Sequence, residues 1–183
     1  MAERILKGQY TNSFLRRSFA QWPNVLKQFD RIWQQLSRQM GGDITVVEIG
    51  TYRGISTSVI ARHVSVVHTY DIEIQPEAVH VWKTEGVSNR IHQHKIIGPL
   101  VRECLPAKFD AVFIDGNHSY EDALWDYETV KDEAKVIVFD DVTVQFPGVV
   151  RLLKEIEWSR KWIVLYCGRF AICWRHEDEE GQT

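Results

Sequence analysis

Two short stretches of the chain place carboxylates directly after an apolar run. Asp115 follows residues 111–114 and precedes His118 by three positions, and Asp140 and Asp141 follow residues 136–139. Carboxylate oxygens suit hard divalent cations, and a histidine titrates near neutrality, where it can take a proton from a hydroxyl group. The alternative is structural, because an aspartate after a parallel strand often only caps a turn, and His118 could simply shape its loop.

A third stretch, "EIGTYRGIST", carries Gly50 and Gly54 four positions apart. A dinucleotide-binding turn needs a further glycine where this chain has Tyr52, so that the backbone can approach a pyrophosphate. Glu48, two residues before Gly50, is a poor neighbour for phosphates. The loop therefore favours a ligand with positive charge, such as one with an ammonium and a sulfonium group, although a plain strand-to-helix turn without a ligand stays open.

The elements that must position these residues alternate along the chain. Apolar and β-branched runs predict five strands, and two more runs joined by Gly168 and Arg169 predict a hairpin. The expected strands are 43–50, 66–73, 91–98, 109–116, 135–141, 162–167 and 170–175. The expected helices are 22–40, 55–64, 76–84, a short one after Pro99, 119–133 with Ser119 as N-cap, and 148–159.

This alternation predicts an α/β fold, a doubly wound, Rossmann-like, seven-stranded and mostly parallel sheet with a terminal antiparallel hairpin and helices on both faces. The default strand order is 3-2-1-4-5, in which the first and fourth strands are neighbours across the switch point where ligands bind. In that order Gly50, Asp115 and the pair Asp140 and Asp141 converge on one edge of the sheet.

Four motifs in this order resemble those of class I S-adenosylmethionine (SAM)-dependent methyltransferases. "VVEIGTYRGIST" is similar to the first motif of the catechol O-methyltransferase group, and "TYDIEIQPEAV" resembles its second motif. "FDAVFIDGNHSY" and "VIVFDDV" resemble the ends of its fourth and fifth strands, and the Asp-Gly-x-His-x-Tyr form is closer to the metal-dependent O-methyltransferases of antibiotic and sugar tailoring. The resemblance covers residues from about 43 to 175.

The resemblance implies a SAM site in which Glu48 and Gly50 contact the methionine end. Ser56 would lie near the methionine carboxylate of SAM, and Tyr52 near its methyl-bearing sulfur. Asp71 would hold the ribose hydroxyls, and Glu73 is the alternative residue for that role. The implied cofactor-binding residues are Glu48, Gly50, Thr51, Tyr52, Gly54, Ser56, Asp71 and Asp115. The adenine contacts stay unassigned, because Gly98 and Pro99 follow the third strand where many relatives carry a polar residue.

The resemblance also implies that Asp115, Asp140 and Asp141 bind Mg²⁺ or another divalent cation, and that His118 is the general base. Such a cation lowers the pKa of a hydroxyl that it coordinates, as it does for water. The expected function is O-methyl transfer to a small hydroxylated molecule. A metal-independent methyltransferase and a non-catalytic or regulatory protein that binds SAM or a nucleoside are the alternatives. Metal-dependent hydroxylation is disfavoured, because non-haem iron oxygenases use two histidines and one carboxylate.

The 183 residues fit one domain, with an N-terminal extension at 1–20 and an acidic tail at 176–183 that we expect to be disordered. A net charge of -3 disfavours nucleic-acid binding. No apolar run is long enough to span a membrane, and no secretory signal is visible. The three cysteines form no C-x-x-C pair, which indicates reduced thiols and a cytoplasmic protein. Oligomerisation stays open, and we assign His92 and His94 to surface or packing roles.

Overall fold

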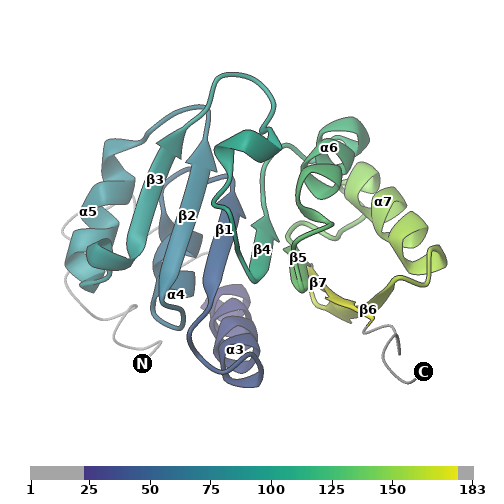
Figure 1. Ribbon diagram of the computed structural model, residues 1–183, viewed down its shortest axis with the longest axis horizontal. Helices are drawn as coiled ribbons and strands as arrows, with labels where there is room; N and C mark the ends of the chain where they lie inside the picture. The colour runs from purple at the N-terminus through teal and green to yellow at the C-terminus, as the bar shows by residue number, and fades with distance from the viewer. Residues whose placement is uncertain (1–22, 177–183) are drawn as a thin grey trace.

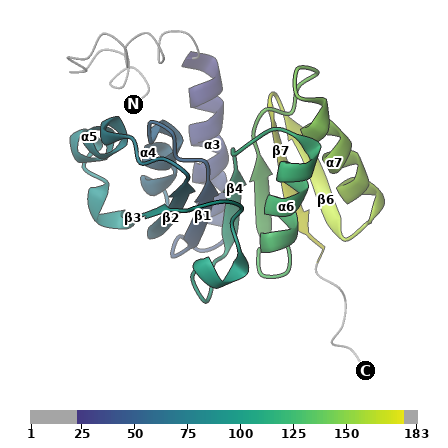
Figure 2. The same ribbon diagram turned by 90° about the horizontal axis from the view of Figure 1, so that it is seen from above.

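The computed structural model describes residues 23–176, which form one seven-stranded sheet between two layers of helices (Figures 1 and 2). The strand order is β3-β2-β1-β4-β5-β7-β6. The strands are β1 (Thr45–Ile49), β2 (Val66–Asp71), β3 (Ile91–Lys95), β4 (Ala111–Ile114), β5 (Val136–Phe139), β6 (Trp162–Cys167) and β7 (Phe170–Arg175). The first five strands are parallel, and β7 pairs antiparallel with both β5 and β6.

Helices cover both faces of the sheet. A hydrophobic cluster lies between the sheet and the helices on each face. One cluster joins α3, α4 and α5 to the sheet, and the other joins α6 and α7 to its opposite face. The helices are α3 (Pro23–Gln39), α4 (Ile55–Ala61), α5 (Pro76–Glu85), α6 (Tyr120–Val130) and α7 (Pro147–Trp158), with 3-10 turns η1 (Ser88–Arg90) and η2 (Arg102–Cys104).

Every residue of β4 and β5 is buried, which explains why these strands are continuous apolar runs and not alternating ones. Successive side chains supply the two clusters in turn: Phe113 packs with α3, and Ile114 packs on the side of α6 and α7. The sheet is therefore a central layer that must have helices on both sides.

The doubly wound fold and the predicted order of the first five strands are confirmed. Ser119 caps α6, accepting a hydrogen bond from the N–H of Asp122 as expected. The short helix expected after Pro99 is present as the 3-10 helix Arg102–Cys104. Residues 1–20 and nearly all of the tail 176–183 lie outside the described residues, and so does the expected helix start at residue 22.

The terminal hairpin inserts β7 beside β5, so that its turn returns to the edge where the parallel strands end. Phe139 of β5 is in register with Ala171, and the N–H of Val142 donates a hydrogen bond to the carbonyl oxygen of Arg169 at 2.8 Å. The hairpin thus brings Arg169 beside the residues that follow β5. Among residues 23–176, no helix has the length and apolar character that crossing a bilayer requires.

Candidate active site

The turn after β1 lies against the end of β4, and Gly50 makes this approach possible. Gly50 has a φ of 97°, and a Cβ atom there would lie 2.0 Å from the carbonyl oxygen of Asp115. Any larger residue would therefore push the two strand ends apart. The backbone hydrogen bonds of the sheet continue into this region. The N–H of Gly50 donates to the carbonyl oxygen of Tyr70, and the N–H of Asp115 donates to the carbonyl oxygen of Ile49.

Asp71 fastens the turn after β1 to the end of β2. One oxygen of its carboxylate accepts hydrogen bonds from the N–H groups of Thr51, at 2.9 Å, and Tyr52, at 2.7 Å. Its other oxygen accepts from the N–H of Glu73 at 3.0 Å. Tyr52 has a φ of 42°, uncommon outside glycine, and its side chain is 61% exposed. Asp71 thus holds a strained turn in place and presents Tyr52 outward.

Glu48 lies behind this turn, fully buried on the face of the sheet that α4 covers. Its Oε2 atom accepts hydrogen bonds from the hydroxyls of Thr57, at 2.5 Å, and Thr69, at 2.7 Å, while Oε1 has no hydrogen-bond partner among the described residues. Burial raises the pKa of Glu48 to about 7, against the lowering effect of these hydroxyls. Glu48 thus ties the turn, α4 and β2 together from inside.

Gly54 is the N-cap of α4 and packs directly against α5. Its φ is 69°, and a Cβ atom there would lie 2.5 Å from Nε1 of Trp82. The indole N–H of Trp82 donates a hydrogen bond to the carbonyl oxygen of Gly54 at 2.9 Å. The glycine therefore serves helix packing, and it lines neither of the cavities described next.

Two cavities open at the edge where the parallel strands end. The α3 cavity, of about 260 Å³, lies between α3, the turn after β1 and the hairpin. The α6 cavity, of about 600 Å³, lies between the ends of β2, β3 and β4 and the start of α6. Gly50, Tyr52 and Asp115 line both. A ligand that fills the two cavities would therefore pass over the end of β1 and beside Asp115.

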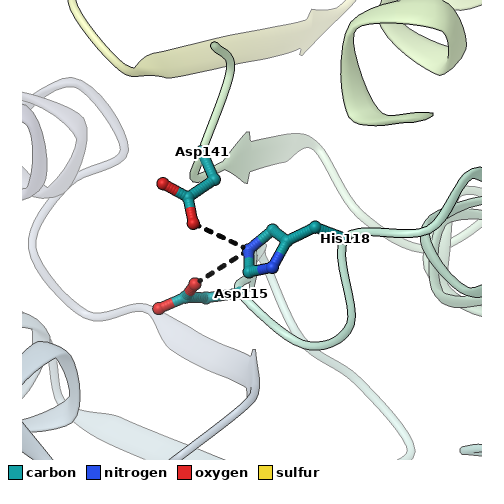
Figure 3. Close-up of side chains that lie close together, drawn as sticks. All are labelled: Asp115, His118 and Asp141. Atoms are coloured by element: carbon teal, nitrogen blue, oxygen red, sulfur yellow. Dashed lines mark ion pairs between the residues drawn. The ribbon is translucent and has the colours of Figure 1, made fainter. Parts of the chain in front are cut away.

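His118 lies between two carboxylates beside this junction (Figure 3). Its Nε2 atom is 3.5 Å from Oδ1 of Asp115 and 3.2 Å from Oδ2 of Asp141, and its ring packs on Phe146 with centroids 4.5 Å apart. The nearby carboxylate of Asp115, and next the charge of Asp141, raise the pKa of His118. These are ion-pair contacts without hydrogen-bond geometry, so the buried Nε2 atom has no hydrogen-bond partner within the described chain.

Asp140 has a different partner, the guanidinium of Arg169 from the hairpin turn. Nε of Arg169 donates to one oxygen of Asp140 at 2.6 Å, and an Nη donates to the other at 3.1 Å and also to Asp141. Burial, and next the charge of Asp115, raise the pKa of Asp140 to about 7 in spite of this arginine. The arginine thus partly neutralises two of the three aspartates that the sequence assigns to a metal.

The donor atoms around His118 fit a divalent cation in part. One ligand atom each from Asp115, His118 and Asp141 lie within 4.8 Å of one another, and the unpartnered Nε2 atom faces this group. Asp141 has a φ of 54°, a conformation that costs free energy outside glycine and is typical of functional sites. Asp140, by contrast, is outside this group, and both of its carboxylate oxygens accept hydrogen bonds from Arg169.

The structure therefore gathers most of the predicted site. Gly50, Thr51, Tyr52, Ser56, Asp71, Asp115 and Asp140 line one or both cavities. His118 and Asp141 lie beside Asp115, whereas Glu48 and Gly54 line neither cavity. Glu73, the fallback for Asp71, contributes only its backbone N–H to that residue.

Three residues escaped the sequence analysis. The sequence indicates Arg169, which binds Asp140, only as a residue of the hairpin turn. It indicates Asp126, which lines the α6 cavity, only as a polar position of a helix. His68 of β2 stacks on both His92 and His94 of β3, with Nδ1 of His68 3.1 Å from Nε2 of His94. The strand register places His68 opposite His92, a pairing that the alternating pattern of one strand cannot reveal.

A family model described as a methyltransferase domain matches residues 47–142, more than half of the chain. A search of curated proteins finds no match to this chain. Among solved structures it resembles a proposed O-methyltransferase from Klebsiella pneumoniae, with a TM-score of 0.66 and 16% identity over 96% of this chain and 89% of that one.

Two further solved structures are complexes. The chain resembles the O-methyltransferase TomG from Streptomyces achromogenes, involved in tomaymycin synthesis and solved with SAM, with a TM-score of 0.64 and 19% identity over 80% of this chain and 78% of that one. It resembles an O-methyltransferase from Bacillus cereus, solved with S-adenosylhomocysteine (SAH), with a TM-score of 0.64 and 16% identity over 95% and 96% of the two chains. At these identities the likeness concerns the fold.

Proposed function

Because the chain belongs to the methyltransferase domain family, we propose that it transfers the methyl group of SAM to a hydroxyl oxygen of a small molecule. The observation that carries this proposal is the position of Asp115 and His118. Asp115 lines both cavities, and His118 lies 3.5 Å from it. A base thus stands beside the junction of the two cavities, where a methyl donor that spans them would meet an acceptor.

The turn after β1 and the end of β2 would hold SAM. Asp71 lines the α6 cavity and keeps lone pairs for the ribose hydroxyls besides those that bind Thr51 and Tyr52. Ser56 and Tyr52 line the α3 cavity, where the methionine carboxylate and the sulfonium would lie. Glu48 would act on the methionine end through the turn that it holds, and its direct contact with the cofactor stays a prediction.

His118 would accept the proton of the acceptor hydroxyl at Nε2, the ring atom that faces Asp115 and Asp141. The oxygen, left with the electron pair of its O–H bond, would form a bond to the methyl carbon as the bond from that carbon to sulfur breaks. SAH and a methyl ether leave, and His118 returns its proton to solvent. The two carboxylates stabilise the imidazolium that forms, which is the usual way a base is assisted.

We propose that Asp115 and Asp141, with Asp140 when Arg169 releases it, hold a divalent cation such as Mg²⁺ beside His118. When bound, the cation would supply positive charge that lowers the pKa of the acceptor hydroxyl. Asp115 and Asp141 would orient the acceptor toward His118. The arginine supports the metal-independent alternative, because its guanidinium already counters Asp140 and Asp141.

The experiment is a titration calorimetry measurement with SAM, followed by a methyl-transfer screen of small hydroxylated acceptors with Mg²⁺ or with EDTA. Binding of SAM should raise the melting temperature by mass action, and NAD should not. Chelation should abolish turnover and leave SAM binding largely intact, because the expected cofactor contacts lie on β1 and β2. Turnover that persists in EDTA would select the metal-independent alternative, and no heat with saturating SAM would overturn the proposed function.

A further inference from the structure

Three histidines lie together on β2 and β3, on the face of the sheet against which α6 and α7 pack. The strand register places His68 of β2 opposite His92 and beside Val47, which belongs to the cluster under α6 and α7. In Figure 1 no helix of the described chain lies in front of these two strands, because the connection from β3 to β4 carries just the 3-10 helix η2. His92 is therefore exposed, and His68 and His94 are half-buried.

The close pair in this group joins the two strands instead of running along one of them. Nδ1 of His68 and Nε2 of His94 share a hydrogen bond at 3.1 Å, and the two rings are within 11° of parallel. Two nitrogens bound to one Zn²⁺ at about 2.0–2.1 Å lie roughly 2.9–3.4 Å apart for bond angles of about 90–110°. The two nitrogens are thus already at the separation that a shared cation requires.

The charge state of the pair also suits a metal ligand. Burial, and next the charge of His92, lower the pKa of both His68 and His94, so both rings are neutral at pH 7. A neutral imidazole is the form that binds metal, and its proton can move to the other ring nitrogen. The nitrogen that now donates the shared hydrogen bond can therefore present a lone pair without the loss of a proton.

This pair differs in chemistry from the group around His118. Imidazole nitrogens suit Zn²⁺, Cu²⁺ and Ni²⁺, whereas carboxylate oxygens suit Mg²⁺. Within residues 23–176, the group of three candidate ligands is Asp115, His118 and Asp141, so water would complete the coordination at His68 and His94. The ring of His94 also stacks on Tyr70, with centroids 4.5 Å apart, and Tyr70 lines the α6 cavity while neither histidine does. The histidine pair is thus next to that cavity and outside it.

We propose that His68 and His94 bind one transition-metal cation of the Zn²⁺ or Cu²⁺ class, which links the edge strand β3 to β2. The pairing of an edge strand depends on one neighbour, and β3 is paired with β2 alone. A cation that binds ligands from both strands binds the folded chain and not the unfolded one, so it should stabilise the fold by mass action. The proposed function plays no part in this inference.

The test uses Cu²⁺ and Zn²⁺ alone, in a His118→Ala background that removes the imidazole of the other group. Nitrogen hyperfine splitting in the electron paramagnetic resonance spectrum of bound Cu²⁺ should report two imidazole nitrogens. His68→Gln and His94→Gln should each lose this signal and bind Zn²⁺ at least about tenfold more weakly by calorimetry. Even the loss of a group that merely supports a metal ligand costs about 10–100-fold in affinity.

His92→Gln is the matched control, because His92 stacks on His68 with centroids 4.9 Å apart but makes no contact of the 3.1 Å kind. It should keep the two-nitrogen signal. Saturating Zn²⁺ should raise the melting temperature of the His118→Ala parent and leave that of His94→Gln unchanged, which also verifies that this variant folds. A parent without the two-nitrogen signal, or a signal that persists in both His68→Gln and His94→Gln, would overturn the proposal. Neither outcome bears on the binding of SAM.

Discussion

Asp71, at the end of β2, and Asp140, at the end of β5, are carboxylates at one edge of one sheet with opposite kinds of partner. Asp71 accepts three backbone N–H groups, whose positions the fold determines. Asp140 is bound by the side chain of Arg169, as Asp141 is by His118 and Arg169. Backbone donors cannot leave, whereas side-chain cations can be exchanged for another cation. The β2 side thus suits a constant cofactor, and the β4–β5 side suits a reacting acceptor.

Removing the base should damage only the β4–β5 side. His118→Ala should lower the methyl-transfer rate by roughly 10²–10⁴-fold, the usual range for a general base, and change the affinity for SAM by less than about twofold. In the wild type the raised pKa of His118 keeps the imidazole protonated to a higher pH than usual. Activity should therefore fall as pH drops through that raised value. Steady-state rates over a pH series measure both effects, and an unaffected His118→Ala variant would exclude the base.

On the β1–β2 side, the buried Glu48 should make the free energy of unfolding depend on pH. Its pKa is about 7 when folded against 4.5 for the ordinary group, so the folded state binds the proton more tightly. The resulting stabilisation is complete below about pH 4.5 and is lost as pH rises through 7. Between those limits Glu48→Gln should gain about 3 kcal/mol in unfolding free energy relative to the wild type. Urea unfolding at several pH values measures this, with the exposed Glu121→Gln as control. A constant difference between the two proteins would contradict it.

Two substitutions, Asp71→Ala and Asp71→Asn, test whether Asp71 binds the cofactor. Asp71→Ala should weaken SAM binding by roughly 1.5–3 kcal/mol through lost ribose hydrogen bonds. Asp71→Asn should weaken it less, because the amide oxygen can still accept from Thr51 and Tyr52. Calorimetry with SAM for both variants and for Glu73→Ala decides which residue holds the ribose hydroxyls. Normal binding by Asp71→Ala with weak binding by Glu73→Ala would move the ribose contact two residues along the chain.

The smallest expected effect concerns exchange at Asp140. If Arg169 and a divalent cation use the same oxygens, Arg169→Gln should bind Mn²⁺ about tenfold more tightly than the wild type, since a competing charge only a few ångströms away is removed. Calorimetry with the cation alone reports this without turnover. Arg151→Gln, on the exposed side of α7, is the matched control and should leave the affinity unchanged. Equal affinities in all three proteins would mean that the two cations do not compete.

Much of the site follows from strand ends that the sequence marks clearly. Gly50, Asp71, Asp115 and Asp140 each stand where an apolar run stops, and parallel pairing brings such positions to one edge. Local chemistry also sufficed for the cap of α6, where Ser119 and Asp122 are close in the chain.

Long-range partners could not be predicted. Arg169 meets Asp140 only because β7 enters the sheet next to β5, and nothing local in the turn between the two hairpin strands specifies that neighbour. Asp126 looks like an ordinary polar helix position, and its burial depends on the segment of Leu100 that packs against α6. The segment after Pro99 is a related case, since its 3-10 helix Arg102–Cys104 carries an ion pair from Arg102 to Glu133, which is distant in the sequence.

The contact between Trp82 and Gly54 links the turn after β1 to the fluorescence of a buried indole. The indole N–H is bonded to the carbonyl oxygen of the N-cap residue of α4, directly after the turn that would hold the methionine end of SAM. The emission of an indole shifts in wavelength and intensity when its hydrogen bond or its surroundings change. A ligand that shifts this turn should therefore change the emission of Trp82, one of seven tryptophans in the sequence.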